Sequence, residues 1–326
     1  MLKHFQILLL IVFLCSTVFL GGCAEQVNLV RASDQPPPVE EALKNFAYDK
    51  KPFEAKMEVA EDLGGYELIK VTYPAYFRDD PDNLEVTAWY YRQKGRGPVA
   101  GLLQIPILGG DYGPSKLFAS FYARQGFHVL RFERKAVLFD EELGLEATRR
   151  TIIASVIDMR RGLDWWETLP EVNAAHIGVS GISMGGFLGS LLMAADQRIA
   201  AGALMLNGGD LAKILMFSEE EELVEIREGL RRKHGWDDQR LFEEASRALD
   251  DVDPVALAPR LNPDIILHIP ARFDRVVPWE LSSRWWEAAH RPKRIAVPTG
   301  HYSAVNFLHY IRWRCVHHFR QMFGME

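Results

Sequence analysis

The sequence predicts an α/β domain in which helices cover both faces of a mostly parallel, doubly wound, eight-stranded sheet. From residue 66 onward, short runs of apolar and β-branched residues alternate with longer segments of helical periodicity. This alternation is typical of parallel sheets with helical crossovers. Most of the short runs are continuously apolar, as expected of strands that are buried on both faces. At 326 residues, the chain is long enough to form one large domain of this class.

The expected sheet starts with an antiparallel pair and continues with parallel strands. The first two runs alternate between apolar and polar residues, and a polar turn at residues 79–83 joins them as in a β-hairpin. Helical segments separate most of the later runs, which favours parallel pairing. The eight expected strands are Tyr66–Tyr73, Leu84–Tyr91, Ala100–Ile107, Phe127–Phe132, His176–Ser180, Gly202–Leu206, Asp264–Ile269 and Arg294–Val297.

A further segment, residues 211–253, is rich in Glu and Arg and has helical periodicity. Ligands of doubly wound sheets bind beyond the carboxyl ends of the strands, where this segment starts. We therefore expect a helical lid insertion over a pocket, with solvated surface helices as the alternative. The other expected helices are Lys116–Arg124, Glu146–Thr168, Gly185–Ala195, Leu281–Ala289 and Phe307–Phe323.

Composition and charge exclude several classes of protein. Hydrophobic residues make up 48% of the chain and charged residues 25%, which are ordinary globular values. The net charge is −6 and the Lys and Arg residues are scattered, so nucleic acid is not an expected partner. Two of the three cysteines lie within the first 23 residues, which excludes a disulfide framework. The third, Cys315, lies in the C-terminal helical pattern and is expected to be buried.

The N-terminus has the layout of a bacterial secretory signal. Lys3 provides a positive charge, and Ile7–Leu20 is almost entirely apolar. The Leu-Gly-Gly-Cys sequence that ends at Cys23 resembles a lipobox, in which the cysteine is lipidated and becomes the new N-terminus. A membrane-spanning helix is the alternative, but the apolar run is shorter than the roughly 20 residues that such a helix needs.

This pattern predicts three segments. They are a signal peptide over residues 1–22, a tether over 23–43 that starts at lipidated Cys23 and contains three consecutive prolines, and a folded domain over 44–326. Acyl chains on Cys23 would anchor the protein to a membrane. We expect a location in the bacterial cell envelope, at the outer membrane facing the periplasm, because Ala24 rather than Asp follows the cysteine.

The strongest local motif is Gly-Ile-Ser-Met-Gly, with Ser183 at its centre. It follows an apolar strand and opens a helical run, which is the context of a nucleophile elbow. The tight turn needs glycine at 181 and 185 and would project the Ser183 hydroxyl from the top of the sheet. A glycine-rich turn without chemistry is the alternative. A serine hydroxyl becomes a good nucleophile only when a base takes its proton and an acid orients that base.

Candidate acids and bases follow later strands, in the chain order Ser183, Asp274, His301. With these three motifs in this order, the chain from about residue 55 to 326 resembles an α/β-hydrolase, of the dienelactone-hydrolase and prolyl-oligopeptidase-like branch. The resemblance implies Ser183 as nucleophile, His301 as general base and then acid, and Asp274 as the acid that orients the imidazole. Asp210 is the alternative acid, and Asp253 is expected to cap a helix.

The oxyanion hole of such an enzyme needs two backbone N–H groups. The resemblance places one at Met184, directly after the nucleophile. The other is expected in the glycine-rich loop after the third strand, at Gly110, with Asp111 as the alternative. Many relatives carry a histidine before these glycines, whereas this chain has Leu108.

The resemblance implies a serine hydrolase that cleaves a carboxylic ester through an acyl-enzyme intermediate. The expected partners are a small-molecule ester or acyl substrate and, through the N-terminal lipid, a membrane. A peptidase or amidase of the same fold, or a catalytically silent, lipid-anchored binding protein, are the alternatives. We expect no cofactor and no metal, because the sequence contains neither a zinc-ligand motif nor a glycine-rich nucleotide-binding motif.

Overall fold

A computed structural model describes six segments of the chain. The chain divides into a unit of residues Met1–Val30 and a unit of residues Arg31–Glu326, and the sheet and its helices belong to the second. The signal peptide, Cys23 and the turn expected at residues 79–83 lie outside the described residues. The described segments are residues 29–31, 36–77, 84–95, 97–107, 113–133 and 142–325.

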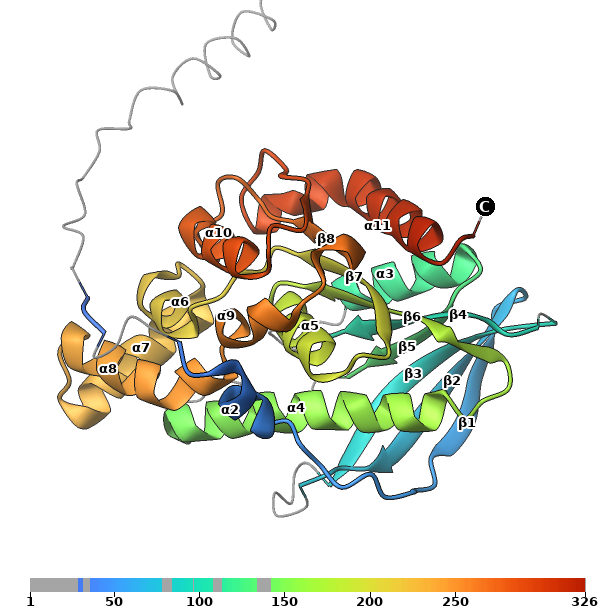
Figure 1. The fold of residues 1–326 in the computed structure, drawn as a ribbon, viewed down its shortest axis with the longest axis horizontal. Coiled ribbons are helices and arrows are strands. Elements are labelled where there is room, and N and C mark those ends of the chain that lie inside the picture. Colours follow the sequence, from blue (N-terminus) through green and yellow to red (C-terminus); the bar gives the residue numbers. More distant parts are fainter. Residues whose placement is uncertain are drawn as a thin grey trace, which may run out of the picture. The chain divides into compact units, whose positions relative to one another are not determined.

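The fold is built on a nine-stranded sheet with the order β1-β2-β3-β5-β4-β6-β7-β8-β9 (Figure 1). The first four strands in this order pair antiparallel, and the remaining strands pair parallel. The sheet is therefore mostly parallel with an antiparallel start, as the sequence predicts. The strands are β1 (Lys56–Asp62), β2 (Tyr66–Pro74), β3 (Glu85–Gln93), β4 (Val99–Ile105), β5 (His128–Phe132), β6 (Val172–Ile182), β7 (Ile199–Met205), β8 (Ile266–Ile269) and β9 (Lys293–Arg294).

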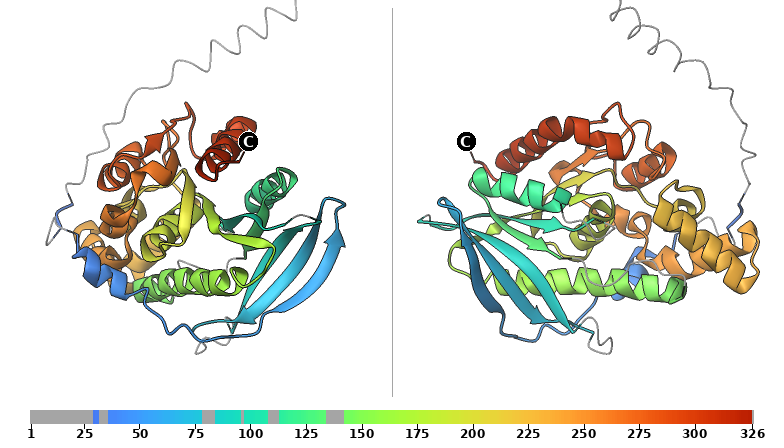
Figure 2. Two further views of the ribbon diagram at one scale, coloured as in Figure 1. Left: turned by 45° about the vertical axis from the view of Figure 1, so that its right-hand side comes forward. Right: turned by 180° about the vertical axis from the view of Figure 1, so that it is seen from behind.

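Helices cover both faces of the sheet (Figure 2). On one face, α3 and α11 pack on alternate strand residues such as Leu102 and Ala203. On the other face, Gly101 leaves room for Trp166 of α4, and Gly202 for Met193 of α5. The helices are α2 (Val39–Lys44), α3 (Gly113–Arg124), α4 (Gly144–Trp166), α5 (Met184–Ala195), α6 (Leu211–Phe217), α7 (Glu221–His234), α8 (Asp238–Leu249), α9 (Pro254–Leu257), α10 (Trp279–Ala288) and α11 (Leu308–Met322).

Two details of the predicted sheet are wrong. The sheet has nine strands rather than eight, because β1 was not expected. All seven residues of β1 are exposed, and the alternation of polar and apolar side chains over residues 56–59 is too short to identify a strand. The last strand is also shorter than the expected Arg294–Val297, since β9 ends at Arg294 and Val297 makes only an isolated bridge with Ala271.

The end of the predicted tether belongs to the folded body. Residues 39–44 form α2, in which Ala42 is fully buried, and Phe46 beyond it is buried as well. Asn45 donates a hydrogen bond to the Asp251 side chain at 3.0 Å. Residues 39–43, which the sequence assigns to the tether, are therefore part of α2, and the buried Ala42 side chain fixes them on the folded body. Among the described helices, none is both long and apolar enough to cross a membrane.

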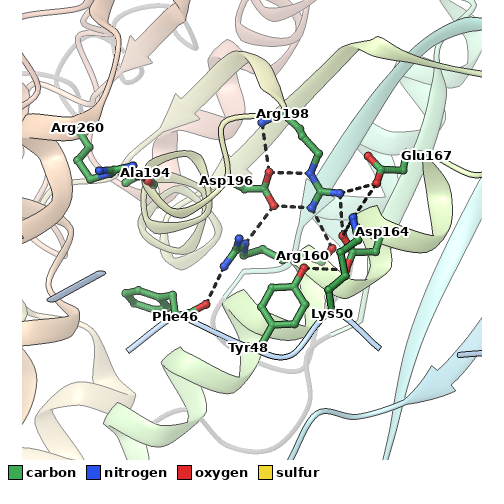
Figure 3. A network of polar contacts seen from close by, with 10 residues as sticks. All are labelled: Phe46, Tyr48, Lys50, Arg160, Asp164, Glu167, Ala194, Asp196, Arg198 and Arg260. Carbon is green, nitrogen blue, oxygen red and sulfur yellow. Dashed lines mark hydrogen bonds and ion pairs between the residues drawn. The ribbon is translucent and has the colours of Figure 1, made fainter. Parts of the chain in front are cut away.

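An ionic network holds the N-terminal segment, α4 and the turn after α5 together (Figure 3). The buried carboxylate of Asp196 accepts hydrogen bonds from Arg198 at 2.6 Å and from Arg160 at 3.1 Å. Arg160 also donates to the backbone oxygen of Phe46 at 2.7 Å, and Arg198 to Asp164 at 2.8 Å. Burial alone would raise the pKa of the Asp196 carboxyl, but the two arginines outweigh it, so this pKa is lowered.

A carboxyl with a lowered pKa in the folded state stabilises the fold above its unfolded-state pKa, and this contribution is lost as the pH falls. Asp196→Asn should therefore lower the free energy of unfolding by about 2–4 kcal/mol at pH 7. The deficit should shrink below about pH 4, because the unfolded chain then binds a proton at this carboxyl more readily than the folded protein does. Urea denaturation at pH 7 and 3.5 measures both values.

The control is Asp49→Asn, whose exposed pair with Lys51 should contribute less than about 0.5 kcal/mol. If Asp196→Asn lowered the free energy of unfolding equally at both pH values, the stabilising role of the Asp196 charge would be contradicted.

Candidate active site

The turn between β6 and α5 holds Ser183 in a strained backbone conformation. Its φ is 52° and its ψ is −122°, a region that L-residues rarely adopt. A Cβ atom at Gly181 would lie 2.0 Å from the backbone oxygen of Gly185, and one at Gly185 would lie 2.8 Å from that of Ile105. Glycine is therefore required at both positions. The Ser183 N–H donates to the backbone oxygen of Met205 at 2.8 Å, which ties the turn to the end of β7.

The structure brings Ser183, His301 and Asp274 into one chain of hydrogen bonds. Nε2 of His301 lies 3.0 Å from Oγ of Ser183, and Nδ1 of His301 lies 2.8 Å from Oδ2 of Asp274. The three residues follow β6, β9 and β8, whose carboxyl ends meet at one edge of the sheet. This is the arrangement in which an imidazole can take a proton from a serine while a carboxylate fixes its tautomer.

The local backbone fixes the Asp274 carboxylate. Its second oxygen, Oδ1, accepts hydrogen bonds from the N–H groups of Val276 at 2.9 Å and Val277 at 2.8 Å. Only 2% of the Asp274 side chain and 9% of the His301 side chain are exposed. Shielding from water strengthens the interaction between the carboxylate and an imidazolium.

The alternative acid, Asp210, is engaged elsewhere. It lies at φ 67° as the N-cap of α6, where its side chain accepts the Lys213 N–H. Its carboxylate forms ion pairs with Arg31 and, at 2.6 Å, with Arg284. Asp253 accepts the N–H of Val255 at 2.7 Å and caps α9, as the sequence predicts.

The histidines and the cysteine of the C-terminal helix α11 lie in surroundings typical of structural rather than catalytic residues. His318 is buried, which lowers its pKa to about 4, and its Nε2 lies 3.1 Å from the backbone oxygen of Ile265. His309 and His317 are exposed on α11. Cys315 is fully buried, and this burial raises the pKa of its thiol to about 12, so the reactive thiolate form is suppressed.

One of the two predicted oxyanion donors lies within the described residues. Met184 is the first residue of α5, and the first N–H groups of a helix have no acceptor within that helix. Its side chain is buried and lines the cavity described below. Gly110, Asp111 and Leu108 lie outside the described residues, so the second donor stays a prediction.

An apolar cavity of about 280 Å³ opens beside the Ser183 hydroxyl. The sequence indicates a pocket only through the insertion at 211–253, and it does not identify the residues of the wall. Of the insertion, α6 and the start of α7 line the cavity, whereas α8 packs against α4. The side chains in its lining that define its shape are Ile107, Leu117, Phe118, Met205, Leu206, Ile214, Leu223, Val277, Val305, Leu308 and Ile311.

Among the described residues, no group of three or more His, Cys, Asp or Glu side chains is arranged to hold a metal ion. The described part of the site therefore offers nucleophilic, acid–base and hydrogen-bonding groups. Together with the apolar cavity, these groups suit attack on a carbonyl carbon that carries a hydrocarbon substituent.

No protein-family model matches the chain. Two uncharacterised proteins from two strains of Mycobacterium tuberculosis are 29% identical to it over 175 residues, which is 51% of this chain. The matched region spans only 37% of the length of these curated relatives.

Solved structures are similar to most of the domain. An acetyl xylan esterase from Paenibacillus sp. R4 superposes with a TM-score of 0.64 at 19% identity, covering 83% of this chain and 91% of that one. Acetyl xylan esterase 1 from Thermoanaerobacterium sp. JW/SL YS485 superposes with a TM-score of 0.63 at 15% identity, and the match covers 85% of this chain and 95% of that one. Acylaminoacyl peptidase from Pyrococcus horikoshii superposes with a TM-score of 0.56 at 16% identity, and the match covers 83% of this chain and 42% of that one. The strand order, the strained turn at Ser183 and these likenesses show that the chain has the α/β-hydrolase fold.

Proposed function

We propose that this protein is a serine hydrolase that cleaves carboxylic esters through an acyl-enzyme intermediate. The observation that carries the proposal is the hydrogen-bonded chain of Ser183, His301 and Asp274 at the wall of an apolar cavity. A simpler polar contact could serve any structural purpose of this serine–imidazole–carboxylate chain. Because burying polar groups costs free energy, the arrangement favours a chemical role.

The reaction proceeds in two halves. Oγ of Ser183 attacks the ester carbonyl carbon while Nε2 of His301 takes the hydroxyl proton. The oxygen of the tetrahedral intermediate is stabilised by the N–H groups of Met184 and Gly110. The bond to the alcohol oxygen then breaks, and His301 delivers its proton to that oxygen. In the second half, His301 takes a proton from water, the resulting hydroxide attacks the acyl carbon, and the acid leaves as Ser183 regains its proton.

Ester cleavage is favoured over amide cleavage by the extent of the structural likenesses. The acetyl xylan esterases superpose over more than nine-tenths of their length, whereas the acylaminoacyl peptidase is matched over 42% of its length. Peptidase or amidase activity remains the second candidate, because the same acid–base chain can cleave an amide. A silent binding protein would not need the intact chain of hydrogen bonds.

We also propose that Cys23 carries the lipid anchor and that the enzyme lies in the bacterial cell envelope, at the outer membrane facing the periplasm. The support is the apolar run followed by Leu-Gly-Gly-Cys at the N-terminus. The proposed membrane contact is through this lipid.

A fluorophosphonate probe tests the nucleophile, because it reacts with a serine only when base and oxyanion hole are assembled. On the full chain in detergent, peptide mass spectrometry should find a single adduct, at Ser183. Ser183→Ala should abolish the adduct, and Ser155→Ala, on α4, should leave it unchanged. A folded wild-type protein without an adduct would contradict the proposal and favour a silent binding protein.

The acid assignment is tested by two matched substitutions. Asp274→Asn should lower kcat by about 10³–10⁴-fold, because the amide cannot hold the imidazole tautomer that accepts the Ser183 proton. Asp210→Asn should lower the melting temperature but keep kcat of the folded enzyme within about tenfold of the wild type. The kinetics of ester hydrolysis and a thermal melt distinguish the two effects. The opposite pattern would identify Asp210 as the acid.

Lipidation is tested by Triton X-114 phase partitioning of the protein expressed with its native N-terminus. Wild-type protein should enter the detergent phase, and Cys23→Ala should leave an unprocessed or soluble form, because the acyl attachment atom is lost. Cys15→Ala, within the predicted signal peptide, is the matched control and should partition like the wild type. Unchanged partitioning and mass in Cys23→Ala would exclude the anchor.

A further inference from the structure

The cavity beside Ser183 has buried apolar walls that come from five different elements. Phe118 of α3, Met205 of β7, Ile214 of α6, Leu223 of α7 and Ile311 of α11 each expose less than a tenth of their surface and line it. Apolar walls of this kind favour hydrocarbon over water, because water finds no hydrogen-bond partners along them.

The size of the cavity sets the length of chain that it can hold. An apolar protein cavity of about 150 Å³ accommodates one benzene molecule, which has six carbon atoms. The cavity beside Ser183 measures about 280 Å³ and is therefore large enough for roughly ten carbons. An acetyl group, with a single methyl beyond the carbonyl, would leave most of this space empty and forgo its apolar contacts.

The acyl part of the ester fits this cavity better than the alcohol part. During the second half of the proposed reaction the acyl group stays bonded to Ser183, so it can occupy an enclosed space. The alcohol must leave before water attacks and needs an open route. The exposed rim formed by Leu117, Tyr302 and Val305 provides such a route.

The charged groups at the cavity determine which chains it accepts. Apart from His301 and the Tyr302 hydroxyl, the ionisable side chains in the described lining are Glu220 and Glu222, and this lining contains no Lys or Arg. The Tyr302 hydroxyl donates to the Glu220 carboxylate, which holds that carboxylate at the cavity. A chain that ends in a carboxylate would face the negative charge of Glu220 beside apolar walls, which is unfavourable.

We infer that the cavity is an acyl site for uncharged hydrocarbon chains of about six to ten carbons, which makes medium-chain esters better substrates than acetyl esters. This inference rests on the proposed ester hydrolysis and deepens it. It differs from what the names of the acetyl xylan esterases say of those proteins.

The first experiment measures kcat/KM for p-nitrophenyl esters from acetate to dodecanoate, with alkyl acetates of increasing alcohol length as the second series. In the first series, kcat/KM should rise about threefold to fourfold per methylene, up to a maximum between about six and ten carbons. A maximum at acetate, or a dependence on alcohol length alone, overturns the inference while ester hydrolysis stands. If no ester is cleaved and no fluorophosphonate adduct forms, it is the proposed function that fails.

The second experiment fills the cavity. Leu223→Trp should lower the ratio of octanoate to acetate kcat/KM by about tenfold or more, because the indole occupies the space of several methylenes. Glu225→Trp, on the exposed side of the same helix, should keep the wild-type ratio. If Leu223→Trp does not fold, Ile214→Phe, which fills the cavity from α6, is measured in its place. An unchanged ratio in folded filling variants overturns the assignment of the cavity.

The third experiment tests the charge preference. The p-nitrophenyl ester of hexanoate should be cleaved roughly 30-fold faster, in kcat/KM, than the monoester of adipate, which has the same length and a terminal carboxylate. Glu220→Gln keeps a hydrogen-bond acceptor for Tyr302 but removes the negative charge. It should therefore bring the kcat/KM values of the two esters closer together. Equal rates for the two esters in the wild type overturn the role of Glu220.

Discussion

The site depends on the backbone strain of Ser183. A residue with positive φ between β6 and α5 is kept there by the fit of two glycines against neighbouring backbone and by the hydrogen bond from its N–H to Met205. The sharp turn places Ser183 and Met184, the first residue of α5, at the same cavity. Because β6 lies between β4 and β7 in the sheet, loops from both sides can reach the hydroxyl.

The wall of the cavity and the acid–base loops are joined. The N–H of Glu219, between α6 and α7, donates to the backbone oxygen of Arg275 at 3.0 Å, next to Asp274. Glu220 accepts a hydrogen bond from Tyr302, next to His301. The insertion therefore contacts both loops that carry the partners of Ser183. A displacement of α6 and α7 would alter the cavity and the hydrogen bonds of His301 together, so the proposed acyl binding and the proposed proton transfer would share one structural support.

The sequence was sufficient to predict what depends on local patterns. The apolar runs predict eight of the nine strands, and the Gly-Ile-Ser-Met-Gly turn and the order Ser183, Asp274, His301 predict which side chains meet. It could not predict β1, whose residues are all exposed, or the packing of α2 and the residues just after it. The buried side chains there, Ala42 and Phe46, carry no periodic signal in so short a segment. The cavity was also beyond the sequence, because its walls combine single side chains from elements that are far apart in the chain.

The two candidate acids show why strand order alone does not assign a catalytic role. Asp210 follows β7 and Asp274 follows β8, and both are buried. Arg31 and Arg284 neutralise Asp210, which links the segment before α2 to the start of the insertion and to α10. Among the described residues, Asp274 instead accepts backbone N–H groups at Oδ1, which leaves Oδ2 to His301. A carboxylate whose charge is already balanced by guanidinium groups would do little to stabilise an imidazolium, whereas one held by backbone dipoles keeps its full charge for that purpose. The surroundings of the two carboxylates, rather than their positions along the chain, therefore distinguish Asp210, which holds structural elements together, from Asp274, the partner of His301.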